Sequence, residues 1–63
     1  MNEENLVIAL EAFRADADAQ ARGQSRVELP AGRFANVNRA NGFDYVRLYD
    51  LRGELVTARR FAV

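Results

Sequence analysis

Residues 33–50, RFANVNRANGFDYVRLYD, form two strand-like runs that meet at Asn41-Gly42. An Asn-Gly pair in this setting is the strongest short-range signal for a β-hairpin, because both residues accept the positive φ of a type I′ turn. A two-residue loop also fixes the register of the two strands. From the loop outward it pairs Ala40/Phe43, Arg39/Asp44, Asn38/Tyr45, Val37/Val46, Asn36/Arg47, Ala35/Leu48, Phe34/Tyr49 and Arg33/Asp50.

This register separates the side chains of the hairpin into two faces. The inner face is aliphatic and holds Ala35, Val37, Val46 and Leu48. The outer face mixes aromatic rings with guanidinium and amide groups and holds Phe34, Asn36, Asn38, Phe43, Tyr45, Arg47 and Tyr49. A slip of one residue would exchange the two faces, so their clean separation supports the register. We expect the inner face to lie in the core and the outer face to be the functional surface.

Residues 24–29, which precede the hairpin, predict a further short strand. Pro30-Ala31-Gly32 then fits a three-residue hairpin loop, with proline at the first corner and Gly32 in the left-handed region. The pairs that this loop sets are Leu29/Arg33, Glu28/Phe34, Val27/Ala35 and Arg26/Asn36. Val27 and Leu29 thereby join the inner face.

Residues 50–53, DLRG, repeat this turn design after the hairpin and lead into a fourth strand. A regular ladder gives the pairs Tyr49/Leu55, Leu48/Val56, Arg47/Thr57, Val46/Ala58, Tyr45/Arg59, Asp44/Arg60 and Phe43/Phe61. Val56 and Ala58 then belong to the inner face. Arg59 and Phe61 belong to the outer face.

The N-terminal part of the chain predicts one helix over residues 3–22, capped by Asn2 and ended by Gly23. At 100° per residue, one stripe of this helix is apolar and is expected to cover the sheet: Leu6, Ala9, Leu10, Phe13, Ala17 and Ala21. A second stripe consists of Ile8, Ala12, Ala15 and Ala19. It would let another helix approach closely, or it reflects only the high helix propensity of alanine.

These elements predict a single α+β domain over residues 1–63, an N-terminal helix packed on a four-stranded antiparallel meander in the order 1-2-3-4. The predicted core is small: Leu6, Leu10, Phe13, Val27, Leu29, Val37, Val46, Leu48 and Val56, with Ala35 and Ala58 leaving room for the helix. Chains of this length are only marginally stable alone, and many of them oligomerise. We therefore expect a homodimer.

The composition argues against an enzyme. The chain has no Cys and no His, which excludes disulfides, thiolate or imidazole metal sites and catalysis by either residue. Asp16 and Asp18 lie too close in sequence to share a helix face, and no loop has the spacing of calcium ligands or of a phosphate-binding loop. We expect no catalytic residue, no metal and no cofactor.

Charge is balanced overall but uneven along the chain. Nine arginines and no lysines face nine acidic residues. Residues 1–24 are net acidic, whereas residues 25–63 are net basic. No apolar run of about 20 residues is present, so we expect no membrane association and a cytoplasmic location.

The outer face is the candidate binding site. It consists of Arg26, Phe34, Asn36, Asn38, Phe43, Tyr45, Arg47, Tyr49, Arg59 and Phe61. Rings that alternate with arginines suit single-stranded DNA or RNA, because bases stack on rings while guanidinium groups neutralise phosphates. Arg and Asn on a sheet also match guanine and adenine edges in the DNA major groove.

A protein interface is the alternative for the same face. The rings and apolar groups exceed what a soluble monomer normally exposes, so a second copy or a partner protein would cover them. The zero net charge favours this alternative, because non-specific binding to nucleic acid depends on an excess of positive charge.

Overall fold

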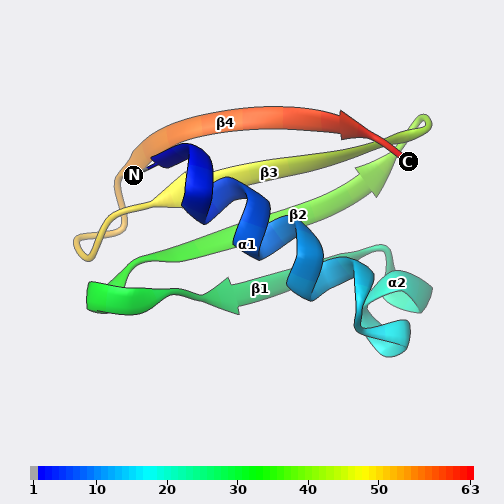
Figure 1. The fold of residues 1–63 in the computed structure, drawn as a ribbon, viewed down its shortest axis with the longest axis horizontal. Helices are drawn as coiled ribbons and strands as arrows, with labels where there is room; N and C mark the ends of the chain where they lie inside the picture. Colours follow the sequence, from blue (N-terminus) through cyan, green and yellow to red (C-terminus); the bar gives the residue numbers. More distant parts are fainter. Residues whose placement is uncertain (1) are drawn as a thin grey trace.

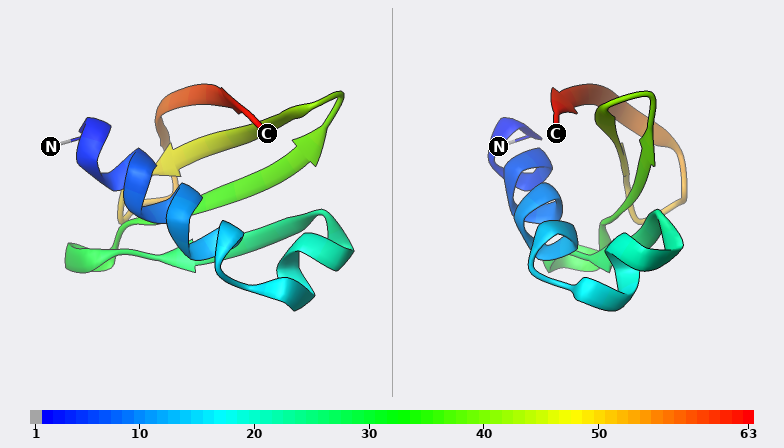
Figure 2. Two further views of the ribbon diagram at one scale, coloured as in Figure 1. Left: turned by 45° about the vertical axis from the view of Figure 1, so that its right-hand side comes forward. Right: turned by 90° about the vertical axis from the view of Figure 1, so that its right-hand side faces the viewer.

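A computed structural model describes residues 2–63 and confirms the α+β fold (Figure 1). The elements are α1 (Asn2–Arg14), α2 (Ala17–Arg22), β1 (Gln24–Glu28), the 3-10 turn η1 (Pro30–Gly32), β2 (Phe34–Ala40), β3 (Phe43–Tyr49) and β4 (Leu55–Ala62). The strands form one antiparallel sheet in the order β1-β2-β3-β4. Helix α1 runs diagonally across one face of this sheet, and the other face is left uncovered by the described residues (Figures 1 and 2). Neither helix is long and apolar enough to cross a bilayer.

The central hairpin has the predicted register from Ala40/Phe43 to Phe34/Tyr49. Asn41 and Gly42 both have positive φ, 55° and 82°, as a type I′ turn requires. The inner face of the hairpin is fully buried, with Val46 and Leu48 at 0% exposure. The turn chemistry therefore determines which side chains form the core.

The register between β1 and β2 is also as predicted, including Val27/Ala35 and Arg26/Asn36. The amide of Leu29 donates to the Arg33 carbonyl at 2.9 Å and closes the loop. Leu29 is buried, and Val27 packs against the core as a partly buried residue.

The prediction of one helix over residues 3–22 is wrong, because the helix breaks at Asp16. This residue has extended backbone angles and caps α2: its carboxylate accepts from the amides of Asp18 and Ala19 at 3.0 and 3.2 Å. The break turns α2 toward β1 and buries Ala19, which was assigned to the second stripe. Ala17 and Ala21, predicted to face the sheet, are exposed.

Asn2 is also not a cap, because it already belongs to α1. The rest of the predicted inner stripe is confirmed, with Leu6, Ala9, Leu10 and Phe13 buried against the sheet. Gly23 ends α2 in the left-handed conformation, as expected.

The predicted register of the fourth strand is wrong beyond its first pair. Tyr49 lies opposite Leu55, but a β-bulge then makes Leu48 the partner of Thr57 instead of Val56. Every later residue of β4 is displaced by one position, so the faces of this strand are exchanged. Val56 and Ala58 leave the predicted core and are exposed.

The bulge turns Arg59 and Phe61 toward α1, because their partners Val46 and Asp44 lie on the inner face. Phe61 packs against the core, and Arg59 forms an ion pair with Glu3 of α1. A regular ladder would have placed Ala58 at the helix and the larger Phe61 in solvent. Burial of the phenylalanine ring thus favours the bulged register. The bulge also accompanies the bend of β4 over the N-terminal end of α1 (Figures 1 and 2).

Asp44 is the buried polar residue at the end of β3, with 0% exposure. Arg39 donates to both of its oxygens at 2.7 and 2.9 Å, as the hairpin register predicts, and Arg14 of α1 donates at 2.9 Å. Arg60, the other predicted partner, lies on the outer face because of the bulge. Hydrogen bonds from Arg39, and then from Arg14, hold the pKa of Asp44 below its ordinary value even though burial opposes this.

Gln20 connects this ion cluster to the helix break. Its side-chain amide donates to the Arg14 carbonyl at 2.7 Å and accepts from Arg39 at 3.1 Å. Asp50, expected to pair with Arg33, instead accepts from the backbone amides of Arg52 and Glu54 at 2.9 Å. These hydrogen bonds, that of Glu54 most of all, lower the pKa of Asp50.

Candidate functional site

The outer face brings together all the predicted site residues of β1, β2 and β3, because the registers of these strands were correct. They are Arg26, Phe34, Asn36, Asn38, Phe43, Tyr45, Arg47 and Tyr49. Arg59 and Phe61 do not belong to this face and are removed from the site. The bulge puts Arg60 there instead, opposite Tyr45.

One end of the outer face carries a closed stack of side chains. The guanidinium of Arg26 lies 3.9 Å from the centroid of the Phe34 ring, and the Phe34 and Tyr49 rings stack at 4.9 Å with an interplanar angle of 11°. Because β2 lies between β1 and β3, Arg26 and Tyr49 cover opposite faces of Phe34. Phe34 therefore offers no free face to a ligand ring and serves as a wall of the site.

The other end carries a more open aromatic group. Phe43 and Tyr45 are tilted by 57° with centroids 6.2 Å apart, and the Arg60 guanidinium lies 4.5 Å from the centroid of Phe43. Both rings are half-buried. Among the described residues, no guanidinium group lies against Tyr45, so it is the ring best suited to stack on a ligand.

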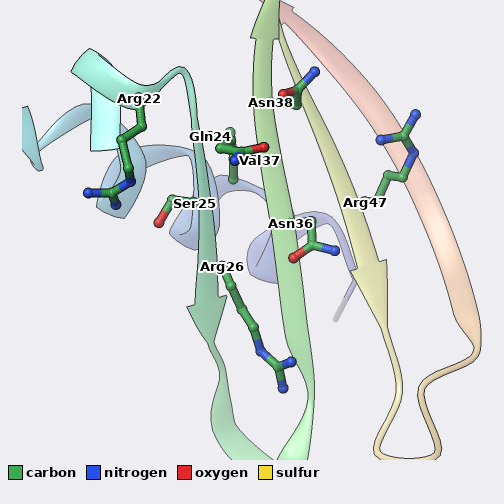
Figure 3. A pocket seen from close by; sticks show the side chains of 8 residues that line it. All are labelled: Arg22, Gln24, Ser25, Arg26, Asn36, Val37, Asn38 and Arg47. Atoms are coloured by element: carbon green, nitrogen blue, oxygen red, sulfur yellow. The ribbon is translucent and has the colours of Figure 1, made fainter. Parts of the chain in front are cut away.

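A polar concavity of about 510 Å³ lies between these two ends (Figure 3). It spans β1, β2 and β3 and the end of α2, and its lining is Arg22, Gln24, Ser25, Arg26, Asn36, Val37, Asn38 and Arg47. The amide side chains of Asn36 and Asn38 rise from β2 in the middle of the view. The side chains of Arg22, Arg26 and Arg47 extend away from them in different directions (Figure 3).

The concavity is positively charged, because three arginines line it and no carboxylate does. Glu28 lies beside it and is bound to Arg26 at 2.7 Å, with both side chains well exposed. Within the described residues, Arg22 and Arg47 form no ion pair. No carboxylate of residues 2–63 therefore competes with a ligand for these two guanidinium groups.

The amide groups of the concavity are likewise available. Within residues 2–63, no side-chain hydrogen bond engages Gln24, Asn36 or Asn38. Each amide presents a donor and an acceptor side by side. The concavity therefore has hydrogen-bonding groups in its middle and positive charge around them. No cluster of three carboxylates suited to a metal lies anywhere in the described part of the chain.

Sequence reasoning missed Arg22, Gln24 and Arg60. Gln24 could have been found, because extending the correct β1/β2 register by two positions pairs it with Asn38. Arg22 reaches the concavity only because α2 turns at Asp16, which the helical pattern did not indicate. Arg60 depends on the bulge.

No match to this chain was found among protein-family models, curated proteins or solved structures. The geometry of the outer face is thus the basis for assigning a function.

Proposed function

We propose that this protein is a small non-catalytic binding module whose outer face binds single-stranded nucleic acid. The observation that supports it is the concavity, which is lined by arginine and amide side chains of α2 and three adjacent strands and by no carboxylate. Phosphate contacts supply most of the affinity in nucleic-acid complexes. The zero net charge of the whole chain is less adverse than it first looks, because none of the nine acidic residues lines the concavity.

The dimensions of the sheet favour a single strand over a duplex. Four strands at a spacing of about 4.8 Å span about 14 Å before side chains are added, whereas the major groove is about 12 Å wide. The face as a whole is therefore too broad to enter the groove. A single strand can lie across it with its bases turned toward the sheet, as in other sheet-based modules.

The side chains divide into three roles under this proposal. Arg47 and Arg60 contact phosphates, Tyr45 stacks on a base, and Asn36 and Asn38 bond to base edges. Arg60 takes the role that the sequence had suggested for Arg59, whose guanidinium instead pairs with Glu3.

Fluorescence anisotropy of a labelled single strand, measured at 50 and 200 mM salt, tests the proposal. Arg47→Gln combined with Arg60→Gln should lower the slope of log K against log salt by up to about 1.4, since each phosphate contact contributes about 0.7 for single strands. Tyr45→Ala should weaken binding with little change in slope, because stacking releases few ions. Arg52→Gln, in the exposed β3–β4 turn, is the matched control. Absence of binding by the unmodified protein at 50 mM salt would overturn the proposal.

A homodimer or partner-protein interface is the second candidate. The observation that favours it is an apolar area beside the open edge of β4, where Leu55 and Val56 are 57% and 42% exposed. Unpaired edges and exposed apolar groups commonly mark association sites. Sedimentation equilibrium should then give about twice the 7.1 kDa monomer mass, and Leu55→Ser with Val56→Ser should return it to the monomer value. A monomer at high micromolar concentration would exclude the homodimer.

A further inference from the structure

We infer that the concavity seats one nucleotide base on Gln24, Asn36 and Asn38, while the phosphates on either side of that base lie at the surrounding arginines. This inference rests on the proposed function, which supplies the class of ligand. It adds where a nucleotide sits and which part of it enters the concavity.

The size and chemistry of the middle of the concavity support a base. A volume of about 510 Å³ lies within the range of about 300–1,000 Å³ typical of small-molecule sites. Gln24 and Asn38 are opposite each other in the β1/β2 register, and Asn36 lies two positions along β2 on the same face. Their paired donors and acceptors are complementary to base edges, which in a single strand are free of other partners.

The positions of the arginines argue against a phosphate at the centre. A centrally bound phosphate needs guanidinium groups that converge on it, since the strongest contacts are bidentate. Figure 3 shows the opposite arrangement, with the Arg22, Arg26 and Arg47 side chains directed away from the amides and from one another. Positive charge around an uncharged, hydrogen-bonding centre matches a base flanked by backbone phosphates. It does not match a phosphorylated side chain or a free anion.

Side-chain NMR signals of the labelled protein provide the test. Titration with nucleoside 5′-monophosphates should shift the NH₂ signals of Gln24, Asn36 and Asn38. Ribose 5-phosphate, which lacks the base, should shift only the arginine Nε signals. Asn38→Leu, which removes the amide at similar volume, should weaken nucleotide binding by about fivefold, the effect of one hydrogen bond. Asn2→Leu makes the same change at an exposed site outside the concavity and should have no effect.

The possible results separate this inference from the proposed function. If oligonucleotides bind but the amide signals stay fixed with both oligonucleotides and mononucleotides, the base site and the base-edge roles of Asn36 and Asn38 are wrong. The binding of single-stranded nucleic acid by the outer face then still stands. If ribose 5-phosphate shifts the same amides as the nucleotides, the concavity is an anion site and the inference is overturned. If neither oligonucleotides nor mononucleotides bind, both proposals fail.

Discussion

Replacing Asp44 with asparagine should destabilise the fold more than any other isosteric change. Asn keeps the size of the side chain but removes its negative charge, leaving Arg14 and Arg39 next to an uncharged group at the end of β3. One of its two terminal atoms also becomes a donor and faces a guanidinium group. The change therefore turns three charge-assisted hydrogen bonds into weaker or repulsive contacts.

The exposure of the partners sets the expected magnitude. Breaking a fully buried ion pair costs about 3–5 kcal/mol, but the side chains of Arg14 and Arg39 are 38% and 28% exposed and regain some hydration. We expect the lower limit, about 3 kcal/mol. For 63 residues the total stability is about 3–9 kcal/mol, so the variant should lie near the edge of unfolding.

Thermal and urea denaturation followed by circular dichroism will measure this effect. A loss of about 3 kcal/mol corresponds to a fall in Tm of about 12–24 °C for a domain of this size. Asp18→Asn is the control, since the carboxylate of Asp18 is exposed and forms no ion pair within the described residues. A difference of less than about 0.5 kcal/mol between the two variants would refute the argument that the Asp44 ion cluster stabilises the fold.

The same carboxylate predicts acid sensitivity. The pKa of Asp44 is lower in the folded protein than in the unfolded chain, so the folded state holds the proton less tightly. Its contribution is therefore complete above the unfolded value of about 3.9 and is lost as the pH falls through the lower folded value. Stability should decline below about pH 4, and this decline should be shallower in Asp44→Asn. Equal acid dependence in the two proteins would contradict the assignment.

Four further substitutions test the fold. Gly42→Val forces a β-branched residue into positive φ and should cost about 1–3 kcal/mol in urea denaturation, so an unchanged midpoint would argue against the type I′ turn. Ala58→Lys should change stability by less than about 0.5 kcal/mol, because the bulge exposes this residue. A large loss of stability would instead support the regular register, in which Ala58 faces the helix. Phe61→Ala should cost about 1–2 kcal/mol, because the Phe61 ring is partly buried against the core. If the variant were as stable as the wild type, Phe61 would not contribute to the core. Asp16→Ala should cost about 1 kcal/mol because it removes the N-cap of α2. Asp18→Ala is its control, and an equal loss of stability in the two variants would argue against the cap.

The sequence predicted the registers of β1 with β2 and of β2 with β3 correctly. Asn41-Gly42 and Pro30-Ala31-Gly32 each specify a loop length. The registers that these loops set give the paired strands inner faces that are largely aliphatic. Local chemistry and hydrophobic pattern agreed in these places. That agreement is why the side chains predicted for the outer face of β1, β2 and β3 lie on that face.

The β4 register could not be predicted in this way, because both alternating sets in residues 55–62 are mixed. One set contains Leu55, Thr57, Arg59 and Phe61, and the other contains Val56, Ala58, Arg60 and Ala62. Neither is clearly the inner one. Contacts from a distant part of the chain decide between them, namely the core around Phe61 and Glu3 at the start of α1.

The helix break has a similar origin. Residues 15–21 are rich in alanine and favour a continuous helix on propensity alone. Aspartate is a common N-cap residue, but it also occurs on exposed helix surfaces, so Asp16 alone does not indicate a break. The break is favoured by tertiary contacts, the burial of Ala19 and the hydrogen bonds of Gln20 to Arg14 and Arg39.

The outer face carries an arginine from β4 in either register of this strand, for a physical reason. Arg59 and Arg60 are adjacent, and adjacent residues of a strand point to opposite faces, so either register places one arginine outside and one against the helix. The outer one contacts the ring of Phe43, and the inner one pairs with Glu3. A register slip within this pair would change the identity of the outer cation but not its charge. The proposal for the outer face thus depends on the strands whose turns fix their register, and only weakly on the bulge.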